Sequence, residues 1–197
     1  VVVLGDSFTE GQGVREGDTY ARVLEVLLLA ADPGRWEVIN CGRRATDFPR
    51  LFAVFEEAMS YEPDLLLYGM VLNDAARTPE FEARQSYVND WILDRGRMLI
   101  GRPDYVLRPF ESRLRALVRD RWDSYRIGRD TARWYRDMYG EANREGWKQT
   151  QDEWREMQSR MKARGGVMLL AAWPILVGLE GRYPFEDVLQ TVAATCT

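Results

Sequence analysis

Four short runs of apolar residues constrain the fold of this chain most strongly, because each is largely continuous rather than alternating with polar residues. Strands that are buried on both faces, as in parallel sheets, have this pattern. The runs cover residues 1–4, 36–39, 64–68 and 167–173. Two segments with apolar residues at helical spacing, 20–31 and 48–59, separate the first three runs. This alternation predicts an α/β fold, a flavodoxin-like open parallel sheet flanked by helices.

The segment 78–164 differs from the rest of the chain in length and charge. A crossover between parallel strands needs only about a dozen residues, whereas this segment has 87. It contains 19 basic and 15 acidic residues, while the remainder contains 8 and 16. We therefore predict the N-terminal part of an α/β domain over 1–77, a helical insertion over 78–164 that could cap the site, and a continuation of the domain over 165–197.

The overall composition narrows the range of partners. The net charge of −4 gives no general attraction to polyanions, and acidic residues interrupt the arginines of 78–164, so we expect no nucleic-acid surface. The sequence has no run of about 18 apolar residues, so we predict no membrane-spanning helix. Two cysteines do not make a disulfide framework. The compartment and the oligomeric state stay open, because the chain begins at Val1 without Met and a signal peptide could have been removed.

Ser7 is the first residue that could carry chemistry. It belongs to the string GDSFTEGQGV, directly after the first apolar run. Ligands of open α/β sheets bind outside the carboxyl ends of the strands, so a serine at this point is well placed. The plainer interpretation is a turn or a helix cap formed by Asp6 and Ser7. A phosphate loop is a weaker alternative, because the Gly-Lys-Ser/Thr ending of that motif is missing.

Two further strand ends could supply hydrogen-bond donors. Asn40-Cys41-Gly42 follows the second run, and a glycine there can turn its N–H toward the crevice. Gly69 and Asn73-Asp74 follow the third run, and an Asn amide can donate to a developing oxyanion. Each could also be an ordinary strand exit or helix cap. Together they match the needs of acyl transfer, which requires a nucleophile and donors at the oxyanion.

These three strings resemble the first three sequence blocks of the GDSL/SGNH serine hydrolases. The resemblance implies that Ser7 is the nucleophile and that Gly42 and Asn73 are its oxyanion partners. It also implies hydrolysis of a carboxylic ester through an acyl-enzyme, with an acylated sugar, short-chain lipid or thioester as substrate and with no metal or organic cofactor. A sugar O-acyltransferase and a non-catalytic binding module on the same fold are the alternatives.

The chain departs from this family pattern in three places. Arg43-Arg44-Ala45 occupies the stretch where a further glycine is often found, and three residues separate Gly69 from Asn73. The Asp-x-x-His block is missing, and the sequence contains no histidine. We expect the natural protein to continue past Thr197 with a strand and a loop that carries this block.

Two groups of side chains could contact a substrate. Arg43 and Arg44 could bind a carboxylate or phosphate, or pair with an acid such as Asp47. The tryptophans of 78–164 could stack on sugars or bases, but packing onto the main domain is the favoured interpretation. They are Trp91, Trp122, Trp134, Trp147 and Trp154.

Overall fold

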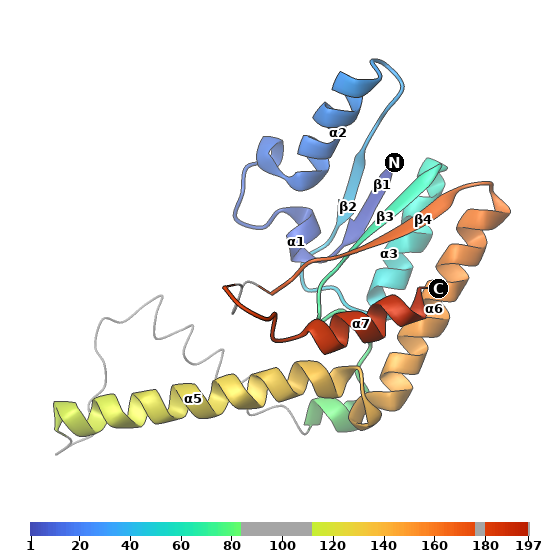
Figure 1. The fold of residues 1–197 in the computed structure, drawn as a ribbon. Coiled ribbons are helices and arrows are strands. Elements are labelled where there is room, and N and C mark those ends of the chain that lie inside the picture. The colour runs from blue at the N-terminus through green and yellow to red at the C-terminus, as the bar shows by residue number, and fades with distance from the viewer. Residues whose placement is uncertain (84–111, 176–179, 197) are drawn as a thin grey trace.

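Four parallel strands form a single sheet in the order β2-β1-β3-β4 (Figure 1). The computed structural model describes residues 1–83, 112–175 and 180–196. The strands are β1 (Val2–Gly5), β2 (Ile39–Gly42), β3 (Leu65–Met70) and β4 (Val167–Ala172). The helices are α1 (Ser7–Glu10), α2 (Tyr20–Ala31), α3 (Arg50–Ala58), α5 (Arg113–Met138), α6 (Arg144–Ala163) and α7 (Glu186–Thr195). The single-turn 3-10 helices are η1 (Glu16–Asp18), η2 (Met59–Tyr61) and η3 (Glu141–Asn143). The sheet and its flanking helices confirm the predicted open parallel α/β fold.

The register of the sheet brings the carboxyl ends of its first three strands to the same level. Gly5 of β1 pairs with Gly42 of β2 on one side and with Gly69 of β3 on the other. The chain moves from β1 to β2 at one side and then crosses to β3 at the opposite side. Such a reversal of strand order is the point at which open α/β sheets bind ligands. Ser7, two residues after Gly5, lies at this point.

One face of the sheet carries the main hydrophobic core. Val2 and Leu4 of β1 are fully buried on this face, together with Leu66 and Tyr68 of β3. Helices α3, α6 and α7 supply the other half of this core. Their contributions include Leu51, Phe55, Trp154, Met157, Met161, Val188 and Val192. The opposite face, at the carboxyl end of β1 and β2, is covered by α1 and α2 (Figure 1).

Two details of the sheet differ from the sequence prediction. The second strand was predicted over 36–39, but β2 begins at Ile39 and includes Asn40, Cys41 and Gly42. These residues pair with β1 through backbone hydrogen bonds, which do not depend on the low strand propensity of Asn and Gly. The expectation of burial on both faces holds for β1 but is wrong for β4, where Val167 and Leu169 are 54% and 51% exposed.

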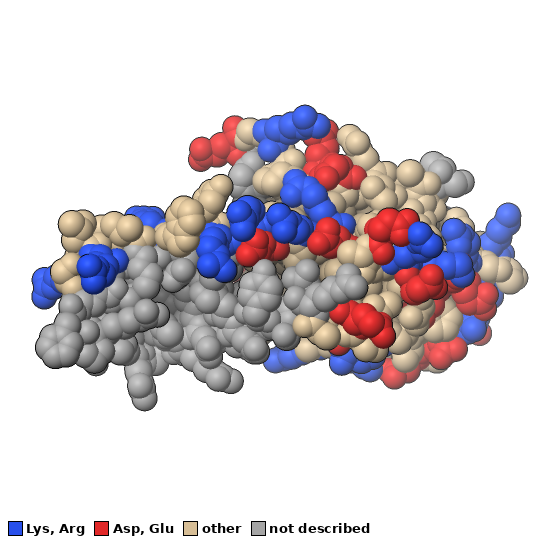
Figure 2. Space-filling model, turned by 90° about the horizontal axis from the view of Figure 1, so that it is seen from below, with Lys and Arg blue, Asp and Glu red and all other residues tan. Residues whose placement is uncertain are grey.

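The predicted insertion, 78–164, contains two helices of different kinds. Helix α6 packs against β4 and α3 and so serves as the crossover between β3 and β4. Helix α5 extends away from the sheet (Figure 1). Figure 2 shows basic side chains along α5 and a mixture of acidic and basic side chains over the rest of that face. Within the described residues, no helix is long and apolar enough to cross a membrane.

The tryptophans of this segment have different surroundings. Trp147 and Trp154 are buried in the main core, and Trp134 packs against it, so packing is confirmed for these three. Trp122 is exposed and contacts the ring of Tyr125, with ring centroids 6.2 Å apart. Trp91 lies outside the described residues, as does 84–111 of the predicted cap.

Candidate active site

Ser7 is held in place because the short helix α1 lies directly on the sheet. A Cβ atom at Gly42 would stand 2.2 Å from the Glu10 nitrogen and 2.5 Å from the Thr9 carbonyl carbon. A Cβ atom at Gly5 would stand 2.1 Å from the Thr9 hydroxyl oxygen. All three distances are far below van der Waals contact, so only glycine permits this approach at either position. Gly5 and Gly42, the second of which sequence analysis linked to an oxyanion donor, therefore allow α1 to lie against the strand ends.

Polar contacts fix α1 to the end of β2. The Asn40 side-chain amide donates to the Thr9 carbonyl oxygen over 2.8 Å. The Arg44 backbone N–H donates to the Glu10 carboxylate over 3.1 Å, and the Arg44 guanidinium pairs with the same carboxylate at 2.8 Å. The Thr9 hydroxyl lies 2.8 Å from the Tyr20 hydroxyl of α2. Helix α1 is only one turn long, so these contacts rather than its own hydrogen bonds hold it.

The Ser7 side chain is partly exposed and its hydroxyl has no hydrogen-bond partner among the described residues. Asp6, directly before it, is buried and caps α1, since its carboxylate accepts the Phe8 N–H over 2.9 Å. Burial raises the pKa of the Asp6 carboxyl above its ordinary value, although this hydrogen bond opposes the shift. The capping interpretation of Asp6 is thus confirmed, and it leaves the Ser7 hydroxyl free to face solvent.

A tight turn after β3 presents Asn73. The Asp74 N–H donates to the Val71 carbonyl oxygen over 3.0 Å, and the Val71 N–H donates to the Asp74 carboxyl over 2.9 Å. The Asp74 side chain is fully buried, and the Tyr68 hydroxyl donates to it over 2.7 Å. Burial is the main reason that the pKa of Asp74 lies well above the ordinary aspartate value. The turn is therefore fixed by a buried carboxyl group.

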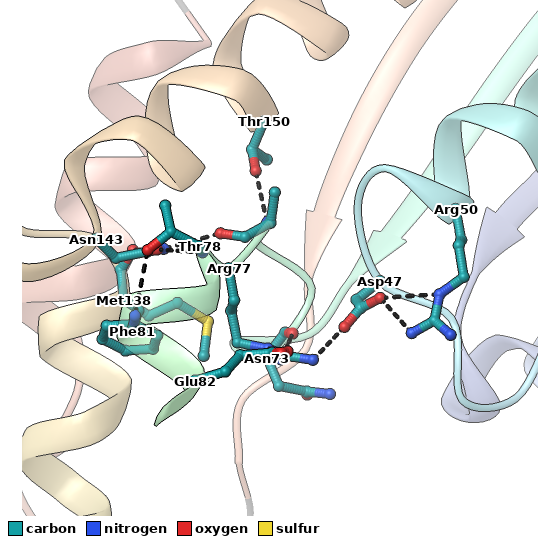
Figure 3. Close-up of polar contacts among 11 residues, drawn as sticks. Asp47, Arg50, Asn73, Arg77, Thr78, Phe81, Glu82, Met138, Asn143 and Thr150 are labelled. Carbon is teal, nitrogen blue, oxygen red and sulfur yellow. Dashed lines mark hydrogen bonds and ion pairs between the residues drawn. The ribbon is translucent and has the colours of Figure 1, made fainter. Parts of the chain in front are cut away.

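The Asn73 side-chain amide, in this turn, has no hydrogen-bond partner among the described residues. Asn73 is partly exposed. Its backbone carbonyl oxygen accepts from the Arg77 guanidinium over 3.1 Å, as Figure 3 shows. A fixed backbone and a free amide are the properties that an oxyanion donor needs.

The donor on the β2 side is less simple than the sequence pattern implies. The Gly42 N–H donates to the Asn40 side-chain oxygen over 2.9 Å, so this group already has an acceptor. Three residues further on, Ala45 has a φ of 54°, the left-handed conformation that glycine favours. The Ala45 N–H has no acceptor among the described residues. Sequence analysis overlooked Ala45 because an alanine gives no signal of a left-handed backbone.

The two arginines of this loop are paired with acids, although not with Asp47. Arg43 pairs with Glu57 at 2.8 Å, and Arg44 pairs with Glu10 at 2.8 Å. A groove of about 890 Å³ lies beside Arg44 and Gly42, between α1, α2 and β2, but neither Ser7 nor Asn73 lines it. The described residues contain no cluster of three or more acidic, cysteine or histidine side chains that could hold a metal ion.

Comparison with known proteins gives little further information about this site. No protein-family model matches the chain, and no curated protein matches it. Among solved structures, the crystal structure of TesA is similar to this chain at 16% sequence identity, with a TM-score of 0.46. The alignment covers 100% of this chain and 74% of that one. The assignment of roles to Ser7, Gly42 and Asn73 therefore depends on the residues of this chain alone.

Proposed function

We propose that this fold carries an ester-hydrolase site in which Ser7 is the nucleophile. The observation that supports this proposal is the arrangement of three loops at one edge of the sheet. Ser7 follows the central strand β1, while Gly42 ends β2 on one side and Asn73 follows β3 on the other. An ester carbonyl bound above Ser7 would have a hydroxyl below it and hydrogen-bond donors on both sides.

In this mechanism the Ser7 oxygen attacks the carbonyl carbon of the ester and forms a tetrahedral intermediate. The hydroxyl proton of Ser7 passes to solvent water, and the leaving group takes up a proton from solvent when its bond to the carbonyl carbon breaks. The negative charge on the former carbonyl oxygen is stabilised by the Asn73 amide and by a backbone N–H of the β2 loop, from Gly42 or Ala45. Collapse expels the alcohol or thiol and leaves an acyl group on Ser7, which water then removes. Acylated sugars, short-chain lipids and thioesters are the substrate classes that the family resemblance implies.

The sequence contains no histidine, so Ser7 lacks the usual base of a catalytic triad. Asp6, Asp74 and Glu10 do not replace it, since Asp6 caps α1, Asp74 is buried within its turn and Glu10 is paired with Arg44. Loss of a triad member leaves an acceleration of about 10³–10⁴ over water, which comes from the oxyanion donors and from binding. This chain should therefore hydrolyse activated esters slowly. A second candidate is a binding module on the same fold, in which the unpartnered Ser7 hydroxyl and Asn73 amide would hold an acyl ester without cleaving it.

Labelling and slow turnover test the proposal together. A fluorophosphonate at high concentration should label Ser7, as peptide mass spectrometry would report. Ser7→Ala should remove the label, whereas Ser60→Ala, in the 3-10 helix η2 at an exposed position, should not. Asn73→Ala should lower the hydrolysis of 4-nitrophenyl acetate by about 10²–10³, the cost of losing one oxyanion donor. Sugar acceptors added to this assay would reveal acyl transfer.

Three outcomes would contradict hydrolysis. The first is labelling that persists in Ser7→Ala, and the second is turnover that Asn73→Ala leaves unchanged. The third is ester binding, detected as a rise in thermal midpoint, with neither labelling nor turnover. That last result would favour the binding module.

A further inference from the structure

Arg77 connects the two loops that follow β2 and β3, the strands on either side of the one that delivers Ser7. Its guanidinium donates to the Asn73 carbonyl oxygen over 3.1 Å and forms a close ion pair with Asp47. The Arg77 Nε atom lies 3.3 Å from a Glu82 carboxylate oxygen. The central guanidinium carbon, Cζ, is 5.9 Å from the centroid of the Trp134 ring. Figure 3 shows Arg77 between Asn73 and Asp47, with Arg50 on the far side of Asp47. Three separate acceptors therefore use the donors of one rigid guanidinium group.

These acceptors belong to different parts of the site. Asp47 lies in the loop between β2 and α3, downstream of Gly42 and Ala45, whereas Asn73 ends the turn after β3. The Phe48 N–H also donates to the Asp74 carbonyl oxygen over 2.9 Å, so the two loops meet at a second point. β1, which delivers Ser7, lies between β2 and β3 in the sheet, so this connection joins the loops that follow the two strands on either side of it.

The environment of Arg77 makes this connection stronger than an ordinary surface ion pair. The Arg77 and Asp47 side chains are 18% and 14% exposed, so water and salt screen their attraction only partly. Arg50 pairs with the same Asp47 at 2.7 Å, but its side chain is 67% exposed. Exposed pairs of that kind contribute little. The two arginines share one acidic partner and differ in burial and in the contact with Asn73.

We infer that Arg77 is a positioning residue for Asn73, an inference that depends on the proposed oxyanion role of that amide. The Arg77 guanidinium restrains the Asn73 carbonyl group, and the buried Asp74 carboxyl restrains the following residue. Both contacts act on the peptide unit that follows Asn73, while the Tyr139 hydroxyl donates to the Leu72 carbonyl oxygen over 3.0 Å and so restrains the unit that precedes it. These contacts restrict the directions in which the free amide can point. We assign Arg77 a positioning role rather than a substrate contact, because three of its five guanidinium N–H donors are already used within the protein.

Nuclear magnetic resonance of the protein tests positioning without any need for turnover. The Asn73 side-chain amide gives a pair of signals that Asn73→Ala identifies by their loss. Arg77→Met keeps the length of the side chain and removes its donors, and it should shift and broaden this pair. Arg50→Met serves as the matched control, because it removes an ion pair with the same Asp47 but no contact with Asn73. An unchanged amide pair in Arg77→Met would overturn the inference, whatever the activity of the chain.

Kinetics supply the second readout. Arg77→Met should lower kcat for 4-nitrophenyl acetate by about 10- to 100-fold, the cost expected for a displaced catalytic group, with KM unchanged. Arg77→Lys should recover only part of this loss, because an ammonium group cannot serve three acceptors in a plane. Arg50→Met should leave kcat unchanged.

A double-mutant cycle separates this inference from the proposed function. In the Asn73→Ala background, Arg77→Met should have no further effect on kcat, since the group it positions is gone. Effects of Arg77→Met and Asn73→Ala that multiply independently would show that Arg77 acts only on the fold, and would refute positioning. If Asn73→Ala itself changes nothing, the proposed function fails, and the amide signals alone decide the role of Arg77.

Discussion

The buried carboxyl of Asp74 should give this protein a stability that falls as the pH rises. The side chain is fully buried, accepts hydrogen bonds from Tyr68 and Val71, and has a second oxygen, Oδ1, without a partner among the described residues. Its pKa is raised in the folded state, mainly by burial. Between the unfolded pKa of about 3.9 and the folded pKa, the native state therefore binds the extra proton. The sign follows directly, because deprotonation then favours unfolding.

The size of the effect follows from the number of protons involved. One carboxyl group changes the free energy of unfolding by at most about 1.4 kcal/mol per pH unit within this window. Asp74→Asn keeps the shape and the acceptor oxygen but cannot ionise, so this slope should be absent from the variant. The variant should match the wild type near pH 4 and become progressively more stable than it above that. The pH at which the difference stops growing reports the folded pKa of Asp74.

Urea unfolding from pH 4 to 8 at constant ionic strength measures this difference. Asp152→Asn is the control, because a hydrogen bond from Lys148 lowers the pKa of that exposed carboxyl, so its contribution to stability changes only below about pH 4 and its removal should leave the slope from pH 4 to 8 as in wild type. Burial also raises the pKa of Asp6 and Glu153, so the wild-type slope contains their contributions, which cancel in the comparison with Asp74→Asn. Equal slopes in wild type and Asp74→Asn would refute the assignment of a raised pKa to Asp74.

Two substitutions in the β2 loop test the backbone geometry next to Ser7. Gly42→Ala should destabilise the fold by about 3 kcal/mol, the upper end of the range for overpacking. The reason is that the added Cβ would meet the backbone of Thr9 and Glu10. A loss below about 1 kcal/mol in urea unfolding would show that α1 can move away from the sheet. Ala45→Gly should stabilise by about 0.5–1 kcal/mol, since the left-handed conformation costs alanine about 1–2 kcal/mol and the added chain entropy of glycine offsets part of the gain; a destabilised Ala45→Gly in the same assay would contradict the left-handed backbone.

Much of the sheet could be predicted, because most of its strands are continuous runs of apolar residues. Helix α2 was predicted over 20–31 and has those bounds, since its apolar spacing and the Asp32-Pro33-Gly34 stop act locally. Strand β2 was placed three residues too early, because backbone pairing with β1 extends it over Asn40 and Gly42. Local signals therefore fixed the helix, whereas pairing between distant segments decided the strand.

The residues of the candidate site also fall into two groups, those that could be predicted from the sequence and those whose roles depend on tertiary contacts. Ser7 and Asn73 could be proposed from the sequence because a nucleophile and an amide donor are recognisable by residue type, and their strands by composition. The groups that hold them could not, since their roles come from partners far away in the chain. Arg77 is one of 27 basic residues, and its role comes from folding, which places Asp47, 30 residues earlier, beside it. In the sequence Asp74 resembles a helix cap, whereas in the structure its buried carboxyl accepts a hydrogen bond from the buried Tyr68 hydroxyl. In this protein, the residues proposed to react lie in short sequence motifs that can be recognised, whereas the residues that orient them can be identified only from tertiary contacts.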